Sequence, residues 1–239
     1  DEWDAVFHMS FITERDRENF LLFLKLLLKG KSYVELAYMT GVLPIAKYSD
    51  GSELNMFLEY NMATRIRFSE YFGFSDEEVD KLYEKYLQNT KKPQIDREGL
   101  REWYDGYHFE KAKSIYSPRS VVTAVLTGIC DSYWNRTETF EALRFYIDMN
   151  FEGLKDDVLS MLAGERIPVN TGTFSNDMTS FQGKDDVLTL LIHLGYLSYH
   201  WPDKTVTIPN KEVSQEYINA ISTMDWSEVT ASVEDSRKL

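Results

Sequence analysis

The sequence begins 1-DEWDAVF-7, two adjacent acidic residues followed by a mainly apolar run, and this stretch decides the predicted fold. Thr13 to about Lys29 follows as a helix, because Leu and Phe recur there on a broad face. Tyr33 to Met39 is a short apolar and aromatic run that is typical of a buried strand. With the opening stretch as the end of a strand, the three segments predict one strand–helix–strand step of a parallel sheet.

Asp1 and Glu2 are the residue types that end a Walker B strand in P-loop ATPases. In those enzymes one acidic residue holds Mg²⁺, and the next polarises the water that attacks the γ-phosphate. Thr40 ends the neighbouring predicted strand, where P-loop ATPases often have a polar residue that senses the γ-phosphate. The alternative interpretation is that Thr40 is an ordinary strand-end residue and that the two acids are ordinary surface acids.

The phosphate-binding loop that accompanies a Walker B strand, G-x-x-x-x-G-K-[ST], is not found in the sequence. Gly30-Lys31-Ser32 matches its last three positions, but Lys25 stands where the first glycine is required. The match also follows a helix, whereas the motif follows a strand, so Gly30 is interpreted as the glycine that ends the helix. We therefore expect the chain to be a fragment of a longer protein and to be inactive as an ATPase alone.

The chain has 239 residues and a formal net charge of −13. Nucleic-acid binding depends on clustered Lys and Arg; no such run occurs, so nucleic-acid binding is disfavoured. No uncharged apolar stretch of about 18 residues is present, so no transmembrane helix and no membrane partner are predicted.

Cys130 is the single cysteine, which excludes an internal disulfide and fits a reducing, cytoplasmic compartment. The four histidines show no metal-ligand spacing with it or with one another.

After about residue 55 the pattern is helical. Ser75-Asp76-Glu77-Glu78 is a capping box, and Ser117-Pro118 places proline at a favoured first helical position. The overall prediction is a mixed α/β, mostly α-helical fold. Residues 1–55 are the C-terminal half of a P-loop ATPase core, 56–170 a helical region, and 171–239 a winged-helix-like module with a C-terminal tail. The helices expected between residues 75 and 164 lie at about 75–88, 97–104, 118–126, 137–150 and 156–164.

The last region predicts a helix, a two-stranded hairpin and a second helix, the outline of a winged-helix domain. These elements occupy residues 185–194, 196–200, 205–208 and 211–221. Between Lys184 and Tyr217 the sequence has three Lys against five Asp and Glu. A wing that reads DNA is normally basic, so we expect this one to pack on protein.

The stretch 103-WYDGYHF-109 places four aromatic residues around an Asp-Gly turn. The simpler interpretation is a helix end whose aromatic side chains fill the core. The other interpretation is that these aromatics contact a nucleotide or a partner domain.

Several stretches, taken in order along the chain, are more specific than any single motif. They are DEWDAVF from Asp1, YMTGVLPI from Tyr38, FGFSDEEV from Phe72, EWYDGYHF from Glu102, IYSPRSVV from Ile115, SYWNRT from Ser132, and LGYLSY and IPNKEV between Leu194 and Val213. Together they span most of the chain, which resembles the AAA-ATPase-like family of bacterial proteins. Those proteins are large and often fused to a C-terminal PD-(D/E)XK-type nuclease domain.

The resemblance implies that Asp1 coordinates Mg²⁺, that Glu2 is the catalytic base and that Thr40 is a candidate sensor. It implies ATP and Mg²⁺ as cofactors of the complete protein, and a winged-helix-like region after the ATPase core, as in STAND-type ATPases. The implied partners are the remaining half of the ATPase core and a C-terminal effector domain of the same protein. The sequence departs from the family pattern because it contains neither a Walker A loop nor a PD-(D/E)XK motif.

Three functions are therefore considered. The first is a part of an ATP-binding and ATP-hydrolysing protein whose nucleotide state controls an attached effector, such as a nuclease domain. The second is a non-catalytic protein-interaction module in which the ATPase residues are vestigial. The third, which the acidic composition disfavours, is DNA binding through the winged helix.

Overall fold

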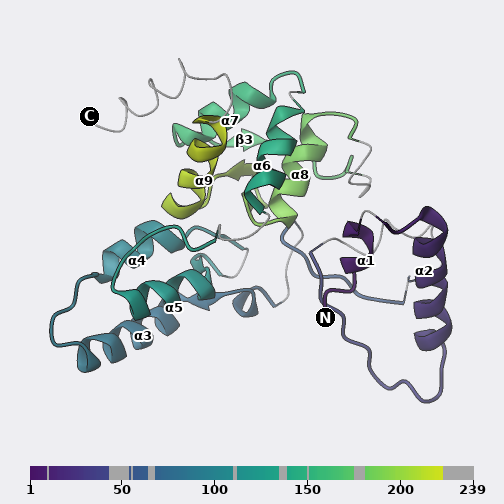
Figure 1. Cartoon of the computed structure of the whole chain (residues 1–239), viewed down its shortest axis with the longest axis horizontal. Coiled ribbons are helices and arrows are strands. Elements are labelled where there is room, and N and C mark those ends of the chain that lie inside the picture. Colours follow the sequence, from purple (N-terminus) through teal and green to yellow (C-terminus); the bar gives the residue numbers. More distant parts are fainter. Residues whose placement is uncertain are drawn as a thin grey trace.

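The computed structural model describes residues 1–9, 11–42, 54, 56–63, 68–109, 112–134, 139–149, 151–174 and 181–222. Over these residues the chain is mixed α/β and mostly helical, as predicted. Buried apolar side chains form three clusters, and Figure 1 shows the elements that carry them as three groups. We call these groups the N-terminal body (residues 1–57), the middle body (74–133) and the C-terminal body (143–221).

The helices predicted from residue 75 onward are confirmed to within a few residues. The helices are α1 (Ala5–His8), α2 (Glu14–Leu28), α3 (Asp76–Asn89), α4 (Arg97–Tyr104), α5 (Pro118–Thr127), α6 (Thr139–Asp148), α7 (Leu154–Leu162), α8 (Lys184–His193) and α9 (Lys211–Ser222), with a 3₁₀ turn η2 (Ser69–Tyr71). The strands are β1 (Phe74–Ser75), β2 (Ile115–Tyr116), β3 (Ile167–Pro168), β4 (Ser198–His200) and β5 (Thr205–Thr207). Among the described residues, no helix is both long and apolar enough to cross a bilayer.

Helix α2 dominates the N-terminal body, where it begins and ends at the predicted residues. The Thr13 hydroxyl accepts the N–H of Asp16 at 3.3 Å, and the N–H of Thr13 donates to the Asp16 carboxylate at 3.0 Å. This reciprocal pair is a capping box, which satisfies N–H groups left open at a helix start. Gly30, with φ +66°, follows the end of the helix. On the inner side of α2, Leu21 is buried in one cluster with Trp3.

The strands predicted for the N-terminal body are not formed in the described residues, which corrects the expected strand–helix–strand step. Residues 1–4 lead directly into α1, and residues 33–41 are irregular. A strand forms only where a neighbouring strand pairs with its N–H and C=O groups. Leu36 and Tyr38 are 85% and 84% exposed, so no described element covers these two side chains.

In the middle body, α3, α4 and α5 enclose a core with the short antiparallel pair β1 and β2, in which Phe74 lies opposite Tyr116. The capping box predicted at the start of α3 is confirmed, because the N–H of Ser75 donates to the Glu78 carboxylate at 2.9 Å. Pro118 lies in the first turn of α5, as predicted.

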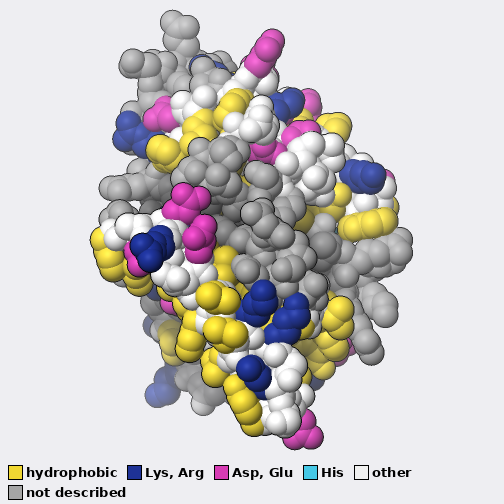
Figure 2. Space-filling model, turned by 90° about the vertical axis from the view of Figure 1, so that its right-hand side faces the viewer, with side chains coloured by type: hydrophobic (Ala, Val, Ile, Leu, Met, Phe, Trp, Pro, Cys, Tyr) yellow, Lys and Arg dark blue, Asp and Glu magenta, His cyan; other side chains and the backbone are white. Residues whose placement is uncertain are grey.

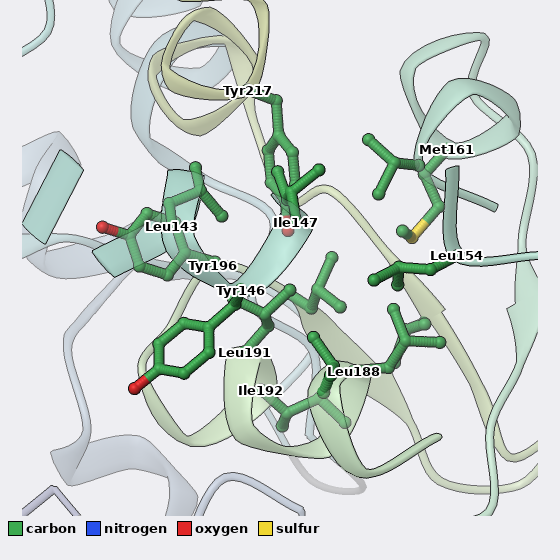
Figure 3. Packing of buried hydrophobic residues seen from close by; sticks show 14 of the residues in the cluster. Leu143, Tyr146, Ile147, Leu154, Met161, Leu188, Leu191, Ile192, Tyr196 and Tyr217 are labelled. Atoms are coloured by element: carbon green, nitrogen blue, oxygen red, sulfur yellow. The ribbon is translucent and has the colours of Figure 1, made fainter. Parts of the chain in front are cut away.

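The C-terminal body packs α6 to α9 around a three-stranded antiparallel sheet with the order β3-β5-β4. Figure 3 shows side chains from several of these helices converging, among them Ile147 of α6, Leu154 of α7, Leu188 of α8 and Tyr217 of α9. Helices α6 and α7, which the sequence placed with the middle region, therefore share a core with α8 and α9.

The middle and C-terminal bodies meet along the loop after α4 and the start of α9. The Tyr107 hydroxyl donates to the carbonyl of Gly195 at 2.7 Å. Gly106 has φ +119°, and a Cβ there would lie 1.8 Å from the carbonyl oxygen of Pro209. Only glycine permits both this backbone angle and this close approach.

Candidate functional site

The candidate site lies in the N-terminal body, where residues 1–4 run beside residues 40–42. The N–H of Trp3 donates to the carbonyl of Thr40 at 2.9 Å. The N–H of Val42 donates to the Asp4 carboxylate, also at 2.9 Å, and Asp4 is only 2% exposed. These two bonds fix the opening residues against a segment about 40 positions further along the chain.

Gly41 allows this contact. A Cβ on Gly41 would lie 2.5 Å from the Asp4 carboxylate and 2.5 Å from the Trp3 indole ring. Real Cβ atoms do not approach other atoms so closely, so any larger residue would push the two segments apart. We call the contact between residues 1–4 and 40–42 the corner. It is closely packed, although its outer edge, which we call the rim, carries the exposed residues Asp1 and Glu2.

The two sequence-predicted residues Asp1 and Thr40 come together at this corner. The Thr40 hydroxyl donates a hydrogen bond to the Asp1 carboxylate. Asp1 is exposed and Thr40 is half-buried. A carboxylate and a hydroxyl on an open rim are the hard oxygen groups that Mg²⁺ accepts, and Mg²⁺ usually keeps several waters besides one or two protein ligands.

Glu2, the candidate base, is exposed beside this pair, and its backbone has φ +48°. Non-glycine residues rarely adopt this left-handed conformation, which costs about 1–3 kcal/mol and is found most often at functional sites and switch regions. The N–H of Glu2 donates to the Asp1 carboxylate at 3.2 Å. Glu2 thus adjoins Asp1 through the backbone, while its own carboxylate stays at the surface.

Sequence reasoning missed Asp4 and Gly41. The available signal for Asp4 was its position between Trp3 and the apolar pair Ala5-Val6, because an acid that is buried with such neighbours needs a hydrogen-bond partner. Gly41 had no comparable signal, because its role depends on a segment 37 or more residues away. Within the described residues, no group of three or more His, Cys, Asp or Glu side chains is arranged to hold a metal ion.

The remaining sequence candidates lie elsewhere. The aromatic stretch 103–109, which begins with the last two residues of α4, lies in the middle body, where Tyr104 is fully buried and Tyr107 is 6% exposed. Its two tyrosines therefore fill the core, as the simpler interpretation predicted. Gly30, which begins the partial match to a phosphate-binding loop, follows the end of α2 as predicted.

Comparison of the chain with protein-family models, with curated proteins and with solved structures found no match.

Proposed function

We propose that this chain is part of an ATP-binding and ATP-hydrolysing protein of the P-loop, AAA-ATPase-like type, in which nucleotide state controls an attached effector, such as a nuclease domain. The contact between the Thr40 hydroxyl and the Asp1 carboxylate supports this proposal best. Sequence reasoning had selected both residues for their chemistry, and 38 residues separate them along the chain. The backbone bond from Trp3 to Thr40 brings the two side chains within reach of each other.

In this proposal the rim of the N-terminal body contacts the γ-phosphate end of the nucleotide. The Asp1 carboxylate would hold Mg²⁺, which would supply positive charge beside the phosphate oxygens when bound. The Glu2 carboxylate would accept a proton from the attacking water. The Thr40 hydroxyl, bonded to Asp1, would sense whether the γ-phosphate is present.

The proposal requires a phosphate loop from the remaining half of the ATPase core, and the outer side of α2 offers a surface against which such a core can pack. Leu22, Phe23, Leu26 and Leu27 are 42%, 55%, 58% and 41% exposed. Figure 2 views the side of the molecule on which α2 lies and shows hydrophobic side chains gathered there beside Lys and Arg. The second half of α2, from Phe20 to Leu28, is apolar on every side except at Lys25. A helical segment of this kind is usually covered on more than one side.

The same surface favours the second candidate function, a non-catalytic module that binds protein. Exposed apolar side chains of this extent mark interaction sites whether or not ATP is hydrolysed. The two functions differ in the complete gene: an intact G-x-x-x-x-G-K-[ST] favours the ATPase, and a degenerate loop favours the interaction module.

Within the C-terminal body, the segment from about Asp185 to Ile221 is proposed to be a winged-helix-like module that packs on protein. The hairpin of β4 and β5 between α8 and α9, with β3 completing the sheet, supports this assignment. Of the three lysines between Lys184 and Tyr217, two are engaged in ion pairs, Lys184 with Asp157 at 2.7 Å and Lys211 with Glu102 at 2.8 Å. Lysines held in this way and outnumbered by acids are poorly suited to bind phosphates along DNA.

Nucleotide titration of the complete protein, with and without Mg²⁺, tests the proposed site. Asp1→Ala should lose the Mg²⁺-dependent part of ATP affinity, because it removes the metal ligand. Glu18→Gln, a change to an exposed acid on α2, should leave ATP affinity unchanged. Mg²⁺-dependent affinity that is equal in Asp1→Ala and the wild type would contradict the assignment.

A further inference from the structure

A buried carboxylate, that of Glu212, lies where the middle and C-terminal bodies meet. Glu212 is in the first turn of α9 and is fully buried. Its Oε1 accepts three hydrogen bonds, from the Ser120 hydroxyl at 2.9 Å and from the backbone N–H groups of Tyr133 at 2.7 Å and Trp134 at 3.0 Å. One oxygen atom therefore joins α9 to α5 and to the segment that follows it.

The other oxygen of Glu212, Oε2, is buried and has no hydrogen-bond partner among the described residues. The titratable groups that face the carboxylate are Glu216, one turn along α9, and the phenols of Tyr104 and Tyr107 from the middle body. None of these groups is positively charged. The ammonium group of Lys211, the preceding residue, is bonded to an acid on α4.

The environment of Glu212 therefore disfavours its charged form. Burial raises the pKa of Glu212, the hydrogen bonds from Tyr133, Ser120 and Trp134 oppose that rise, and the negative charge of Glu216 adds to it. A carboxyl whose pKa is higher in the folded state than in the unfolded state stabilises the fold in its protonated form. The stability that it contributes is present at low pH and is lost as pH rises through the folded-state pKa.

The junction between the middle and C-terminal bodies also contains a stacked aromatic pair, one member of which is bonded to Glu212. The rings of Trp134 and Tyr196 are stacked, with centroids 5.5 Å apart and planes 9° apart. Trp134 thus bonds to Glu212 through its N–H and packs on the C-terminal body through its side chain. A change at Glu212 is transmitted directly to this stacked pair.

We propose that Glu212 is a proton-sensitive latch between the middle and C-terminal bodies. The neutral carboxyl keeps α9 closed on Ser120 and on the N–H groups of Tyr133 and Trp134. Ionisation places a negative charge with no cationic partner among these groups in the closed junction and loosens it, so that α9 separates more often from Tyr133 and Trp134. This inference does not depend on the proposed ATPase function.

Amide hydrogen exchange of the whole chain, followed from below the ordinary glutamate pKa of 4.5 up to mildly alkaline pH, tests the latch. The readout is the protection of the Tyr133 and Trp134 amides, corrected for the intrinsic pH dependence of exchange. Glu212→Gln keeps an acceptor oxygen but cannot ionise. Relative to this variant, wild-type protection should fall with rising pH, by about tenfold for each unit by which the folded-state pKa is raised.

Glu216→Gln makes the same chemical change one turn further along α9. A fall in protection should remain in this variant, with its midpoint at lower pH than in the wild type, because the Glu216 charge that adds to the rise in the Glu212 pKa is removed. Parallel pH profiles in the wild type and Glu212→Gln would overturn the proposal. A profile flattened by Glu216→Gln and not by Glu212→Gln would also overturn it.

A second variant keeps the test decisive if Glu212→Gln does not fold. Ser120→Ala removes one hydrogen bond to the ionised carboxylate and leaves Glu212 in place, so the midpoint of the fall in protection should move to higher pH. The part of the tryptophan fluorescence that Trp134→Phe removes, which reports the stacked pair, should shift over the same pH range. An unmoved midpoint in Ser120→Ala would contradict the latch.

Discussion

At the scale of single residues, the corner that joins Asp1 to Thr40 depends on the absence of a side chain at Gly41. Close contact between two segments leaves no room for a Cβ there, and the neighbouring atoms belong to the buried side chains of Trp3 and Asp4. The position of Asp1 and Thr40 therefore depends on close packing at Gly41, a residue that would take no part in the chemistry.

Gly41→Ala should therefore lower the free energy of unfolding of the N-terminal body by about 1–3 kcal/mol, the usual cost of forcing extra atoms into a packed site. Thermal unfolding followed by Trp fluorescence measures the change. Gly183→Ala is the matched control, because nothing lies within 4 Å of a Cβ at that position. Equal stability of Gly41→Ala and Gly183→Ala would show that the corner is loosely packed.

A second residue-scale effect concerns His200, at the end of β4. Burial lowers the pKa of His200 to about 4, and the positive charge of Arg166 and the neighbouring His108 act in the same direction. Because the unfolded pKa is near 6.5, the native state binds fewer protons than the unfolded state between these values. The stability of the fold should fall as pH drops from about 6.5 to 4.

His200→Gln should remove this part of the acid dependence, since glutamine does not titrate. The measurement is the difference in Tm between wild type and variant at pH 7 and at pH 4.5. The wild type should lose its advantage over His200→Gln at the lower pH. A difference in Tm that is the same at both values would indicate that His200 titrates normally.

At the scale of elements, the sequence predicted helix boundaries well and the N-terminal strands poorly. Thr13 with Asp16 and Ser75 with Glu78 are local signals, because a cap and its partner lie within one turn. A strand is completed by partners elsewhere in the chain, and residues 33–39 have none among the described residues. The burial of Glu212 was equally hidden, because nothing in its local sequence, IPNKEV, distinguishes it from an exposed acid.

Substitutions on the buried and exposed sides of α2 test whether each side is covered by other parts of the chain. Leu26→Glu should change the free energy of unfolding of this chain by no more than about 0.5 kcal/mol, because Leu26 is 58% exposed. Leu21→Glu should be severely destabilising, because Leu21 is 5% exposed and a buried charge would be unpaired. Chemical denaturation compares the two. Equal destabilisation would show that the outer side of α2 is already covered within the chain.

At the scale of the whole molecule, the described residues form three clusters of different character. The C-terminal cluster is the largest and encloses most of α8, whereas the N-terminal cluster has few buried residues and carries exposed apolar side chains on α2 and at residues 36–38. The candidate site lies on the least enclosed body. The latch at Glu212 lies between the other two, so the two proposals concern separate parts of the molecule.

Steady-state ATP hydrolysis by the complete protein carrying Glu2→Gln tests the central claim most directly. The amide is nearly isosteric with the carboxylate but cannot take a proton from water, so turnover should fall by about 10²-fold or more while ATP binding is retained. Glu18→Gln, the control on α2, should hydrolyse ATP at the wild-type rate. Wild-type turnover in Glu2→Gln would contradict the account and leave Asp1 and Glu2 as ordinary surface acids.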